Sequence, residues 1–305
     1  MEFRPEGCLF DTPSNQRYIS SAEGLAEAME KGIILEARAM LCTGAHDLMI
    51  DLPCARGIIP REEGAIGITE GKTRDIALIS RVNKIVCFKV TELDLTDSGE
   101  LEARLSRKAA QLECENNMIS KLRPGDIIDA RISHMEKFGS FVDLGCGIPS
   151  LVPIDTMSVS RISHPTDRFR TGQLIRVIVK GTKNGMIFLT HKELLGTWEE
   201  NACRFKIGET VPGVVRSIES YGVFVELTPN LAGLAESKEG ISVGQSVSVY
   251  IKAIIPEKMK VKLIIVDVCG EYTPPKEIEY FIKSDHINYW KYSTESSEKN
   301  ISTSF

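Results

Sequence analysis

The feature that most constrains this fold is an internal repeat. FGSFVDLG at residues 138–145 returns as YGVFVELT at residues 221–228, 83 residues further along the chain. A second landmark keeps the same order, because TGQLIRVIVK at 171–180 matches VGQSVSVYIK at 243–252. Two segments that share ordered landmarks are expected to fold alike, so the repeat predicts two copies of one domain.

Each copy has the pattern of short β-strands. In the first copy, apolar and polar residues alternate over 126–138 and 173–180, with short apolar runs at 150–154 and 186–190. Gly or Pro lies in nearly every connection. This pattern predicts a chain dominated by β-structure, built from tandem five-stranded OB-fold barrels joined by short helices. The basic stretch 156–170 has no long counterpart in the second copy, so we expect it on a functional face or at a domain contact.

A fainter copy precedes the other two. Residues 31–90 keep the strand order, with strands expected at 72–81 and 84–90. His46 and Met49 stand where the other copies have aromatic residues. We therefore predict a degenerate OB-like domain whose binding face has lost its rings.

Helical patterns occupy the joints between the barrels. Ser20 and Glu23 have capping-box spacing at the start of a helix expected over 20–32, and further helices are expected over 100–122 and 190–205. The predicted organisation is an N-terminal segment with a helix (1–30), a degenerate barrel (31–90), a helical linker (91–122), an OB-fold barrel (123–190), a helical linker (191–204), a second OB-fold barrel (205–268) and a C-terminal segment (269–305).

The charge is unevenly distributed. The net charge of the chain is −5, but residues 121–192 carry 11 Lys and Arg against 6 Asp and Glu, and residues 205–266 carry 7 against 6. An acidic chain can therefore carry one locally basic face suited to nucleic acid.

Several classes of protein are disfavoured by the sequence. The eight cysteines are scattered without a CxxC motif, which fits buried thiols in a reducing compartment better than a metal site or disulfide framework. No apolar run is long enough to span a bilayer, and the first residues lack the pattern of a secretion signal. We expect a cytoplasmic protein without a membrane partner.

Signals of catalysis are weak. His134, His164 and His191 are far apart and belong to no metal-binding or nucleophile motif, so a solvated or cap-adjacent histidine is the expected state of each. Asp143 and Glu226 follow the repeated aromatics at equal offsets, but they lie in separate domains and are expected to face outward from their strands. We predict no enzyme activity, no cofactor, no metal and no small-molecule substrate.

The repeated aromatic pair is the candidate binding site. Phe138 and Phe141 bracket a bend at Gly139, which would place both rings on one surface for stacking on unpaired bases. The alternative, core packing, is weakened by the second copy. The cations expected to neutralise phosphates on the same side are Lys137, Arg131, Arg170 and Lys180.

Long ordered blocks carry a resemblance to a known family. KLRPGDIIDARISHMEKFGSFVDLGCGIPSLVPI and FLTHKELLGTWEENACRFKIGETVPGVVRSIESYGVFVELTPNLAGLAE resemble the repeated RNA-binding domain of the bacterial ribosomal protein S-one family, in the short multi-domain form of clostridia-like Firmicutes. LSRKAAQLEC and GIIPREE resemble parts of the N-terminal domain of that family. The resemblance implies OB barrels that bind single-stranded RNA through Phe138 and Phe141 in one domain and Tyr221 and Phe224 in the next.

The chain departs from the family pattern at several positions. Pro153 and Glu236 replace a histidine of the third strand, no acid lies between the fourth and fifth strands of the middle domain, and Met186 replaces an arginine. In the third domain Lys260 can fill the arginine role, and the further candidate cations are Arg216 and Lys252. The resemblance also implies that the first domain docks on protein.

These observations together predict a single-stranded RNA-binding protein of translation, a ribonucleoprotein component that binds mRNA on the small ribosomal subunit. Two alternatives remain open: a protein-interaction scaffold with decayed RNA affinity, and an accessory to RNA decay. The aromatic C-terminal residues are expected to pack on the third domain and not to bind bases; they are Tyr272, Tyr280, Tyr289, Trp290 and Tyr292.

Overall fold

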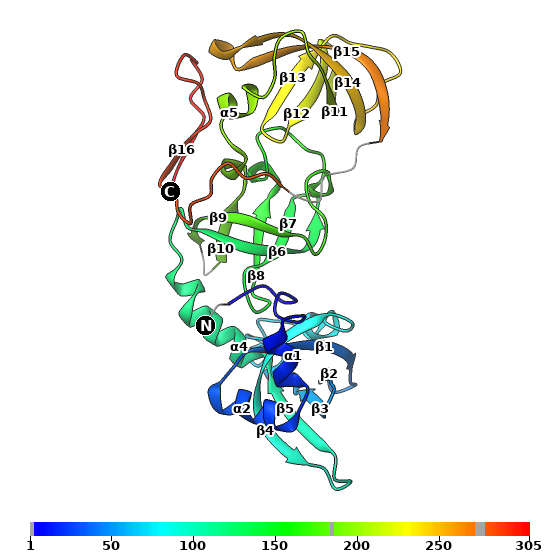
Figure 1. The fold of residues 1–305 in the computed structure, drawn as a ribbon, viewed down its shortest axis with the longest axis vertical. Coiled ribbons are helices and arrows are strands. Elements are labelled where there is room, and N and C mark those ends of the chain that lie inside the picture. Colours follow the sequence, from blue (N-terminus) through cyan, green and yellow to red (C-terminus); the bar gives the residue numbers. More distant parts are fainter. Residues whose placement is uncertain (1–2, 184–185, 272–277) are drawn as a thin grey trace. The chain divides into compact units, whose positions relative to one another are not determined.

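Three closed five-stranded barrels make up most of the chain, as the computed structural model shows (Figure 1). The structure describes residues 3–183, 186–271 and 278–305. Contacts divide the chain into two compact units, Met1–Leu122 with Asp143–Pro149 and Arg123–Val142 with Ser150–Phe305. In every barrel the third strand runs parallel to the fifth, and the first strand is a neighbour of the fourth. The predicted fold class of tandem OB-type barrels is confirmed.

The first barrel belongs to the first unit. Its strands are β1 (Leu35–Cys42), β2 (Leu48–Leu52), β3 (Ala55–Ile59), β4 (Ile85–Leu95) and β5 (Leu101–Ser106). Leu35, Leu48, Ile59, Phe88 and Leu105 fill its interior and are fully buried. Helices α1 (Pro13–Ile19) and α2 (Ala22–Lys31) contribute further apolar side chains to this core.

One strand prediction for the first barrel is wrong, and the predicted end of this domain falls too early. The stretch 72–81 is not a strand, because Ile76–Ile79 forms the short helix α3. The chain rejoins the barrel at β4, and the fifth strand comes only after it. The predicted boundary at residue 90 therefore lies inside β4 and excludes the strand that closes the barrel.

The predicted helix over 100–122 is also wrong in its first part. Helix α4 (Arg107–Asn117) begins after the cap Ser106, and the residues before it are β5. Leu101 and Leu105 are four apart, so they fit one face of a helix, but together with Ala103 they also fit one face of a strand. Pairing with β3 and β4 decides for the strand, since it satisfies the backbone on both sides.

The other joints are shorter and better capped than the sequence suggested. Ser21, and not Ser20, caps α2, because its side chain accepts a hydrogen bond from the Gly24 amide. The helix predicted over 190–205 is split at Gly196 into a 3₁₀ helix, η5, and a short helix, α5. The remaining bounds are η1 Arg61–Glu63, η2 Ile119–Lys121, η3 Ile154–Thr156, η4 Pro165–Asp167, η5 Lys192–Leu195, η6 Pro256–Lys258 and α5 Trp198–Ala202.

The second barrel has the strands expected from the sequence. They are β6 (Ile127–Glu136), β7 (Gly139–Asp143), β8 (Pro149–Pro153), β9 (Leu174–Lys183) and β10 (Met186–Thr190). Ile132, Val142, Val177 and Leu189 point inward and are almost completely buried. Because side chains alternate between faces along a strand, the residues between them form the outer surface.

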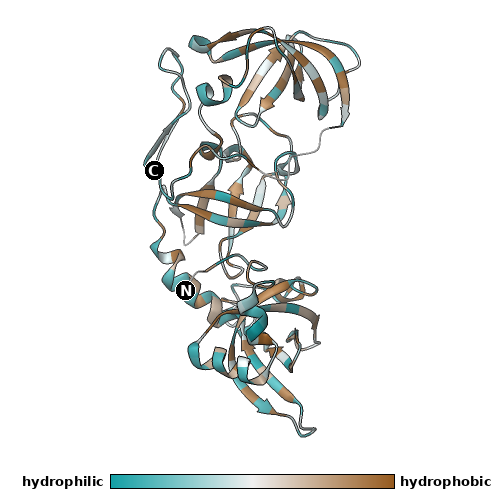
Figure 2. Cartoon of the chain, viewed as in Figure 1, coloured by the Kyte–Doolittle hydropathy of each residue, from teal (hydrophilic) through white to brown (hydrophobic). Residues whose placement is uncertain are grey.

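The third barrel repeats the second. Its strands are β11 (Thr210–Glu219), β12 (Gly222–Thr228), β13 (Leu231–Ala235), β14 (Gln245–Ile255) and β15 (Lys260–Glu271). On β15, Val261, Leu263 and Ile265 are buried while Lys260 and Lys262 are exposed. Figure 2 shows this alternation of hydrophobic and hydrophilic residues along the strands.

The C-terminal segment is part of the second unit. It ends in a small sheet of β16 (Tyr289–Lys291) and β17 (Ser302–Ser304). Trp290 and Tyr292 are buried in the core of the third barrel, which confirms the expected packing for these two residues. For Tyr280 that prediction is wrong, because its hydroxyl accepts a hydrogen bond from the Arg176 amide on the second barrel. Tyr289 is exposed, and Tyr272 lies outside the described residues.

Among the described residues, no helix combines the length and the apolar character that crossing a bilayer requires.

Candidate nucleic-acid interface

The first part of the interface is a pair of rings on the second barrel. Phe138 is 56% exposed on the turn before β7, and Phe141 is half-buried on the outer face of β7. Their ring centroids lie 5.9 Å apart at an interplanar angle of 85°. Gly139 permits this bend, because a Cβ there would lie 2.6 Å from the carbonyl oxygen of Val152 on β8. The bend leaves the Phe138 ring in solvent, where an unpaired base can reach it.

The third barrel has a matching pair. Tyr221 is 67% exposed, and its ring centroid lies 6.2 Å from that of Phe224 at an angle of 90°. Gly222 has a φ of 149°, and a Cβ there would lie 2.5 Å from the carbonyl oxygen of Ala235. The repeated sequence thus builds the same edge-to-face arrangement twice.

His134 adds a third ring that the sequence interpretation missed. Its imidazole lies parallel to the Phe141 ring, with centroids 4.3 Å apart and an angle of 9°. His134 is exposed, so its ring adds to the aromatic surface around Phe141. In the third barrel the corresponding residue, 83 positions further along, is Ser217, which pairs with Phe224 as part of the same strand pair. The repeat itself could have drawn attention to this difference.

The predicted cations of the second barrel fall into two groups. Lys137 is exposed next to Phe138, and Lys180 is exposed on β9. Arg131 is half-buried and donates a hydrogen bond from Nη1 to the Gly172 carbonyl oxygen. Arg170 is also half-buried, and its amide donates to the side chain of Gln173. The two lysines are therefore the cations that extend most fully into solvent.

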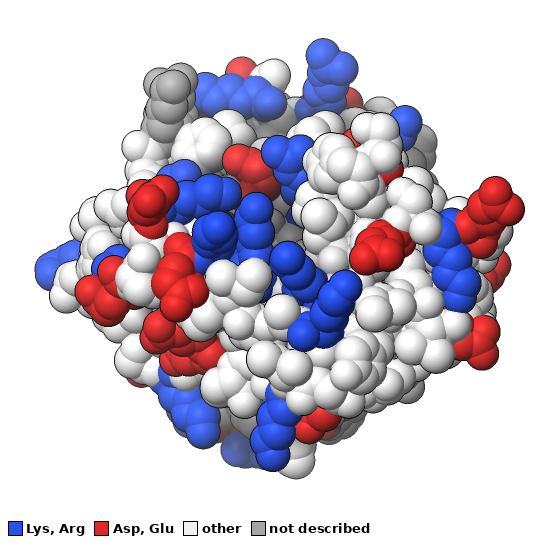
Figure 3. All heavy atoms as spheres, turned by 90° about the horizontal axis from the view of Figure 1, so that it is seen from above, with Lys and Arg blue, Asp and Glu red and all other residues white. Residues whose placement is uncertain are grey.

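The third barrel presents lysines on its outer surface. Lys252 is exposed with its Nζ 3.8 Å from a Glu236 carboxylate oxygen, and Lys260 is exposed at the start of β15. Lys262 was not predicted: it pairs with Leu234, whose other neighbour is Phe224, so all three lie in one outer row. Figure 3 looks onto the end that carries β13–β15 and shows Lys and Arg gathered at its centre, with Asp and Glu among and around them.

The placement of Arg216 corrects its predicted role. Its side chain is almost completely buried, with Nε 2.9 Å from a Glu226 carboxylate oxygen and Nη1 3.4 Å from one of Asp167. An RNA phosphate cannot reach a guanidinium held in this way. Arg216 therefore stabilises the interior of the second unit.

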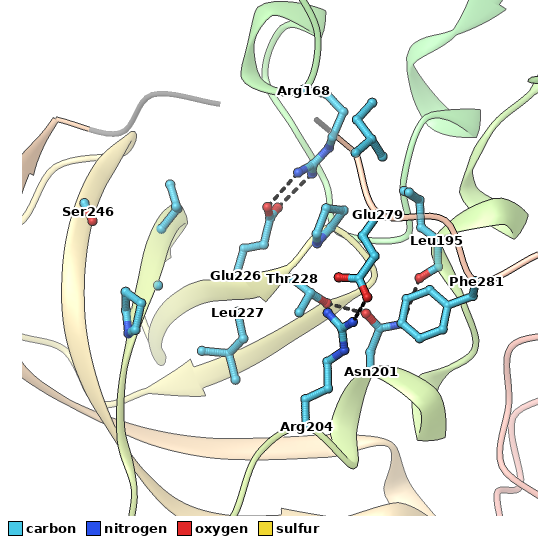
Figure 4. A pocket seen from close by; sticks show the side chains of 15 residues that line it. Arg168, Leu195, Asn201, Arg204, Glu226, Leu227, Thr228, Ser246, Glu279 and Phe281 are labelled. Carbon is cyan, nitrogen blue, oxygen red and sulfur yellow. Dashed lines mark hydrogen bonds and ion pairs between the residues drawn. The ribbon is translucent and has the colours of Figure 1, made fainter. Parts of the chain in front are cut away.

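Glu226 was expected to face outward, and this expectation is wrong. Its carboxylate is buried and accepts hydrogen bonds from Arg168 at 2.7 and 2.8 Å in addition to those from Arg216 (Figure 4). Burial opposes the charged form, but the two guanidinium groups hold the Glu226 pKa below its ordinary value. Because Arg168 comes from the inserted stretch 156–170, that stretch forms a domain contact between the second and third barrels.

A cavity of about 480 Å³ lies beside this ion pair (Figure 4). Leu195, Leu227 and Phe281 supply apolar parts of its lining, and Arg204 forms an ion pair with Glu279 across it. Its charged groups thus already have partners within the unit.

Asp143 is buried too, so its expected outward orientation is also wrong. It belongs to the first unit, where its carboxylate accepts hydrogen bonds from the amides of Glu6, Gly145 and Gly147 at 2.7, 2.8 and 3.0 Å. Burial and the nearby Glu6 carboxylate raise the pKa of Asp143 to about 7, although the three amides favour its charged form. The repeated acid is therefore an internal anchor in both copies and cannot carry surface chemistry.

The two other candidate histidines, His164 and His191, have structural roles. His191 is fully buried between the rings of Phe169 and Tyr280, and burial lowers its pKa to about 4. The expectation of a solvated or cap-adjacent residue is thus wrong for its ring. His164 caps η4 through its side chain, as expected for a cap-adjacent residue. Within the described parts of the chain, no group of three or more His, Cys, Asp or Glu could hold a metal ion.

Comparison with known protein families identifies the domain type of the second barrel. Residues 121–192 match the S1 RNA binding domain, a range that encloses the second barrel. The fold and the site thus define a protein built from repeated barrels of this type. This match and the relatives described next support an S1-type family with repeated domains, as the resemblance in the sequence implied.

Several relatives are similar over most of the chain. The small ribosomal subunit protein bS1 of Leuconostoc lactis is 26% identical over 71% of this chain and 52% of its own length. The bS1 homolog of Bacillus subtilis is 27% identical over 73% and 58%, and bS1 of Staphylococcus aureus is 28% identical over 79% and 63%. The matches therefore span between about half and two thirds of the length of these relatives.

Proposed function

We propose that this chain binds single-stranded RNA, by stacking unpaired bases on the exposed rings of the second and third barrels and by neutralising phosphates with nearby lysines. The observation that carries this proposal is the repeated edge-to-face pair, Phe138 with Phe141 and Tyr221 with Phe224. Such solvent-exposed rings cost free energy unless they have a partner, and each stacked base contributes about 1–3 kcal/mol.

We further propose that the RNA is mRNA and that the protein acts in translation on the small ribosomal subunit, in the cytoplasm. The names of the relatives, which are ribosomal proteins of that subunit, support this setting. Stacking depends little on base identity, and phosphate contacts depend steeply on salt. The function is therefore binding, with no chemical step assigned to any residue.

The first barrel has a different part in this proposal. Met49 stands on β2 without an aromatic neighbour of the kind seen in the other barrels, and His46 lies in the turn before it with a φ of 69°. We assign this barrel to contact with protein on the ribosome. The scaffold alternative would extend that role to all three barrels.

The decisive experiment measures the affinity of the full chain for an unstructured RNA by fluorescence anisotropy. Phe138→Ala with Phe141→Ala should weaken binding by at least tenfold, because one or two stacked bases are lost. Leu174→Ala is the matched control, since Leu174 is an apolar residue of the same barrel, 49% exposed on β9. Equal affinity of the double variant and the wild type would exclude the stacking mechanism.

Ribosome association needs a separate experiment. Co-sedimentation with small subunits at low and at high salt should show binding that weakens as salt rises, if RNA contacts contribute to it. Co-purification with a nuclease and not with ribosomes would favour the accessory role in RNA decay.

A further inference from the structure

We propose that the second barrel holds a second nucleotide of the bound RNA strand in a pocket beside Phe188, separate from the ring pair at Phe138 and Phe141. The inference rests on the proposed function, since it names a further contact of the same RNA strand. It concerns β10, which lies two strands away from β7 in the barrel.

The first step is the position of Phe188. Its neighbours Ile187 and Leu189 point into the barrel and are buried, so Phe188 points outward, where it is half-buried. Phe188 pairs with Leu151 on β8. The Leu151 side chain in turn reaches Gly139 on β7, because a Cβ on that glycine would lie 3.0 Å from Leu151 Cδ1. An apolar path of about 10 Å, two strand spacings, therefore leads from the ring pair to Phe188.

The second step is the cavity at the end of this path. A pocket of about 390 Å³ opens there, with Phe188 in its wall. Its other lining residues come from β8, η3, β9 and β10 and are Pro153, Asp155, Thr156, Lys180, Gly181, Thr182 and Leu189. The ring supplies an apolar surface for a base, and the exposed Lys180 ammonium supplies a partner for a phosphate.

The third step is the charge of the lining, which selects the ligand class. Lys180 and Asp155 are both exposed and carry opposite charges, so the pocket has no net positive charge that would attract a bare phosphate. A nucleotide suits both groups. Its phosphate contacts Lys180, and an exocyclic amine of its base donates a hydrogen bond to the Asp155 carboxylate, as amine-bearing bases do to acidic side chains.

The third barrel lacks this arrangement. Lys262 occupies the place of Phe188, since it pairs with Leu234 as Phe188 pairs with Leu151. A lysine there can contact a phosphate but cannot stack a base. The second subsite is thus specific to the second barrel.

The test uses the full chain and an unstructured oligoadenylate, whose bases carry the required amine. Phe188→Ala should weaken binding about 5- to 100-fold, the loss expected for one stacked base. Lys180→Ala, a change at an exposed residue that does not endanger folding, should lower the salt slope of log affinity by about 0.7. Met186→Ala is the matched control, because Met186 is 54% exposed on the same strand and does not line the pocket.

The outcomes separate the subsite from the general proposal. The subsite is overturned if Phe188→Ala binds with unchanged affinity, or if Met186→Ala loses as much affinity as Phe188→Ala. In either case, a loss of affinity in Phe138→Ala would still support RNA binding by the ring pair. Failure of the wild-type chain to bind oligoadenylate overturns both. If adenosine monophosphate binds and Phe188→Ala abolishes only that binding, the pocket is a site for a free nucleotide. This result would overturn the assignment of the pocket to an RNA strand.

Discussion

The second and third barrels have the same strand order and differ in the side chains on their outer surfaces. Both hold an edge-to-face ring pair at the same bend. The second barrel adds His134 and Phe188, whereas the third has Ser217 and Lys262 at the matching places. Stacking on rings is less sensitive to salt than phosphate neutralisation by lysines. Under the proposed function, the site on the second barrel therefore depends mainly on stacking, and the site on the third barrel depends more on charge.

The difference extends beneath the surface. On the third barrel Glu226 joins Arg168 and Arg216 in a buried ion network, while the second barrel packs a neutral His191 between two rings. Substitutions can test both the buried groups and the surface groups in which the two barrels differ.

The largest effect is expected from Glu226→Ala. The substitution leaves two buried guanidinium groups without their carboxylate, which costs about 3–5 kcal/mol of unfolding free energy. Urea unfolding followed by tryptophan fluorescence measures this directly, because Trp198 and Trp290 both lie in the core of the third barrel. Glu219→Ala, at an exposed position on β11, is the control. A loss below about 1 kcal/mol would show that the network does not stabilise the fold.

The next effect is the response of the second unit to acid. His191 is neutral in the folded state until about pH 4, whereas an unfolded histidine takes up its proton near pH 6.5. The unfolded state thus binds more protons between these values, so unfolding free energy should fall by about 3 kcal/mol as pH drops from 6.5 to 4. In His191→Gln, the unfolding free energy should lack this fall between pH 6.5 and pH 4. An unchanged pH profile in that variant would contradict the assignment.

A smaller effect separates the two binding faces by their salt dependence. Replacing Lys252, Lys260 and Lys262 with alanine should lower the slope of log affinity against log salt by about 2, since each phosphate contact contributes about 0.7. Replacing Lys137 and Lys180 should lower it by about 1.4. Anisotropy titrations at several salt concentrations give both slopes. Equal changes for the two sets would remove the proposed distinction between the barrels.

The smallest effect is expected from Lys262→Phe, which places a ring on β15 where the second barrel has Phe188. Affinity for oligoadenylate at moderate salt should rise by up to about fivefold, because a weak stack replaces one phosphate contact. The salt slope should fall by about 0.7 at the same time. Weaker binding at every salt concentration would mean that position 262 on β15 contacts only phosphate.

Much of the fold was predictable because it is repeated. Alternation of apolar and polar residues and the ordered landmarks located every strand of the second barrel, and the Gly between two aromatics located the bend that exposes Phe138. The first barrel was harder, since its fifth strand, Leu101–Ser106, fits a helical period as well as a strand period. Only its pairing with β3 and β4 distinguishes the two.

The exposed ring pairs of the candidate site were predictable from the sequence, and the partners of its charged side chains were not. An exposed lysine and a buried arginine look alike in sequence, so the ion pairs of Arg216 could not be foreseen. His134 and Phe188 were missed because their meaning depends on strands that are distant in sequence, β7 for the first and β8 for the second.

The sequence by itself determined that this chain repeats a small barrel and that two of the copies expose paired rings, because both properties follow from local periodicity and a glycine at a bend. Only the tertiary structure decided which charged residues reach solvent. Packing the inserted stretch 156–170 on the third barrel buries Glu226, Arg168 and Arg216, and contacts within the first unit, among them the Glu6 amide, bury Asp143. Burial is a property of the whole fold and not of any local pattern.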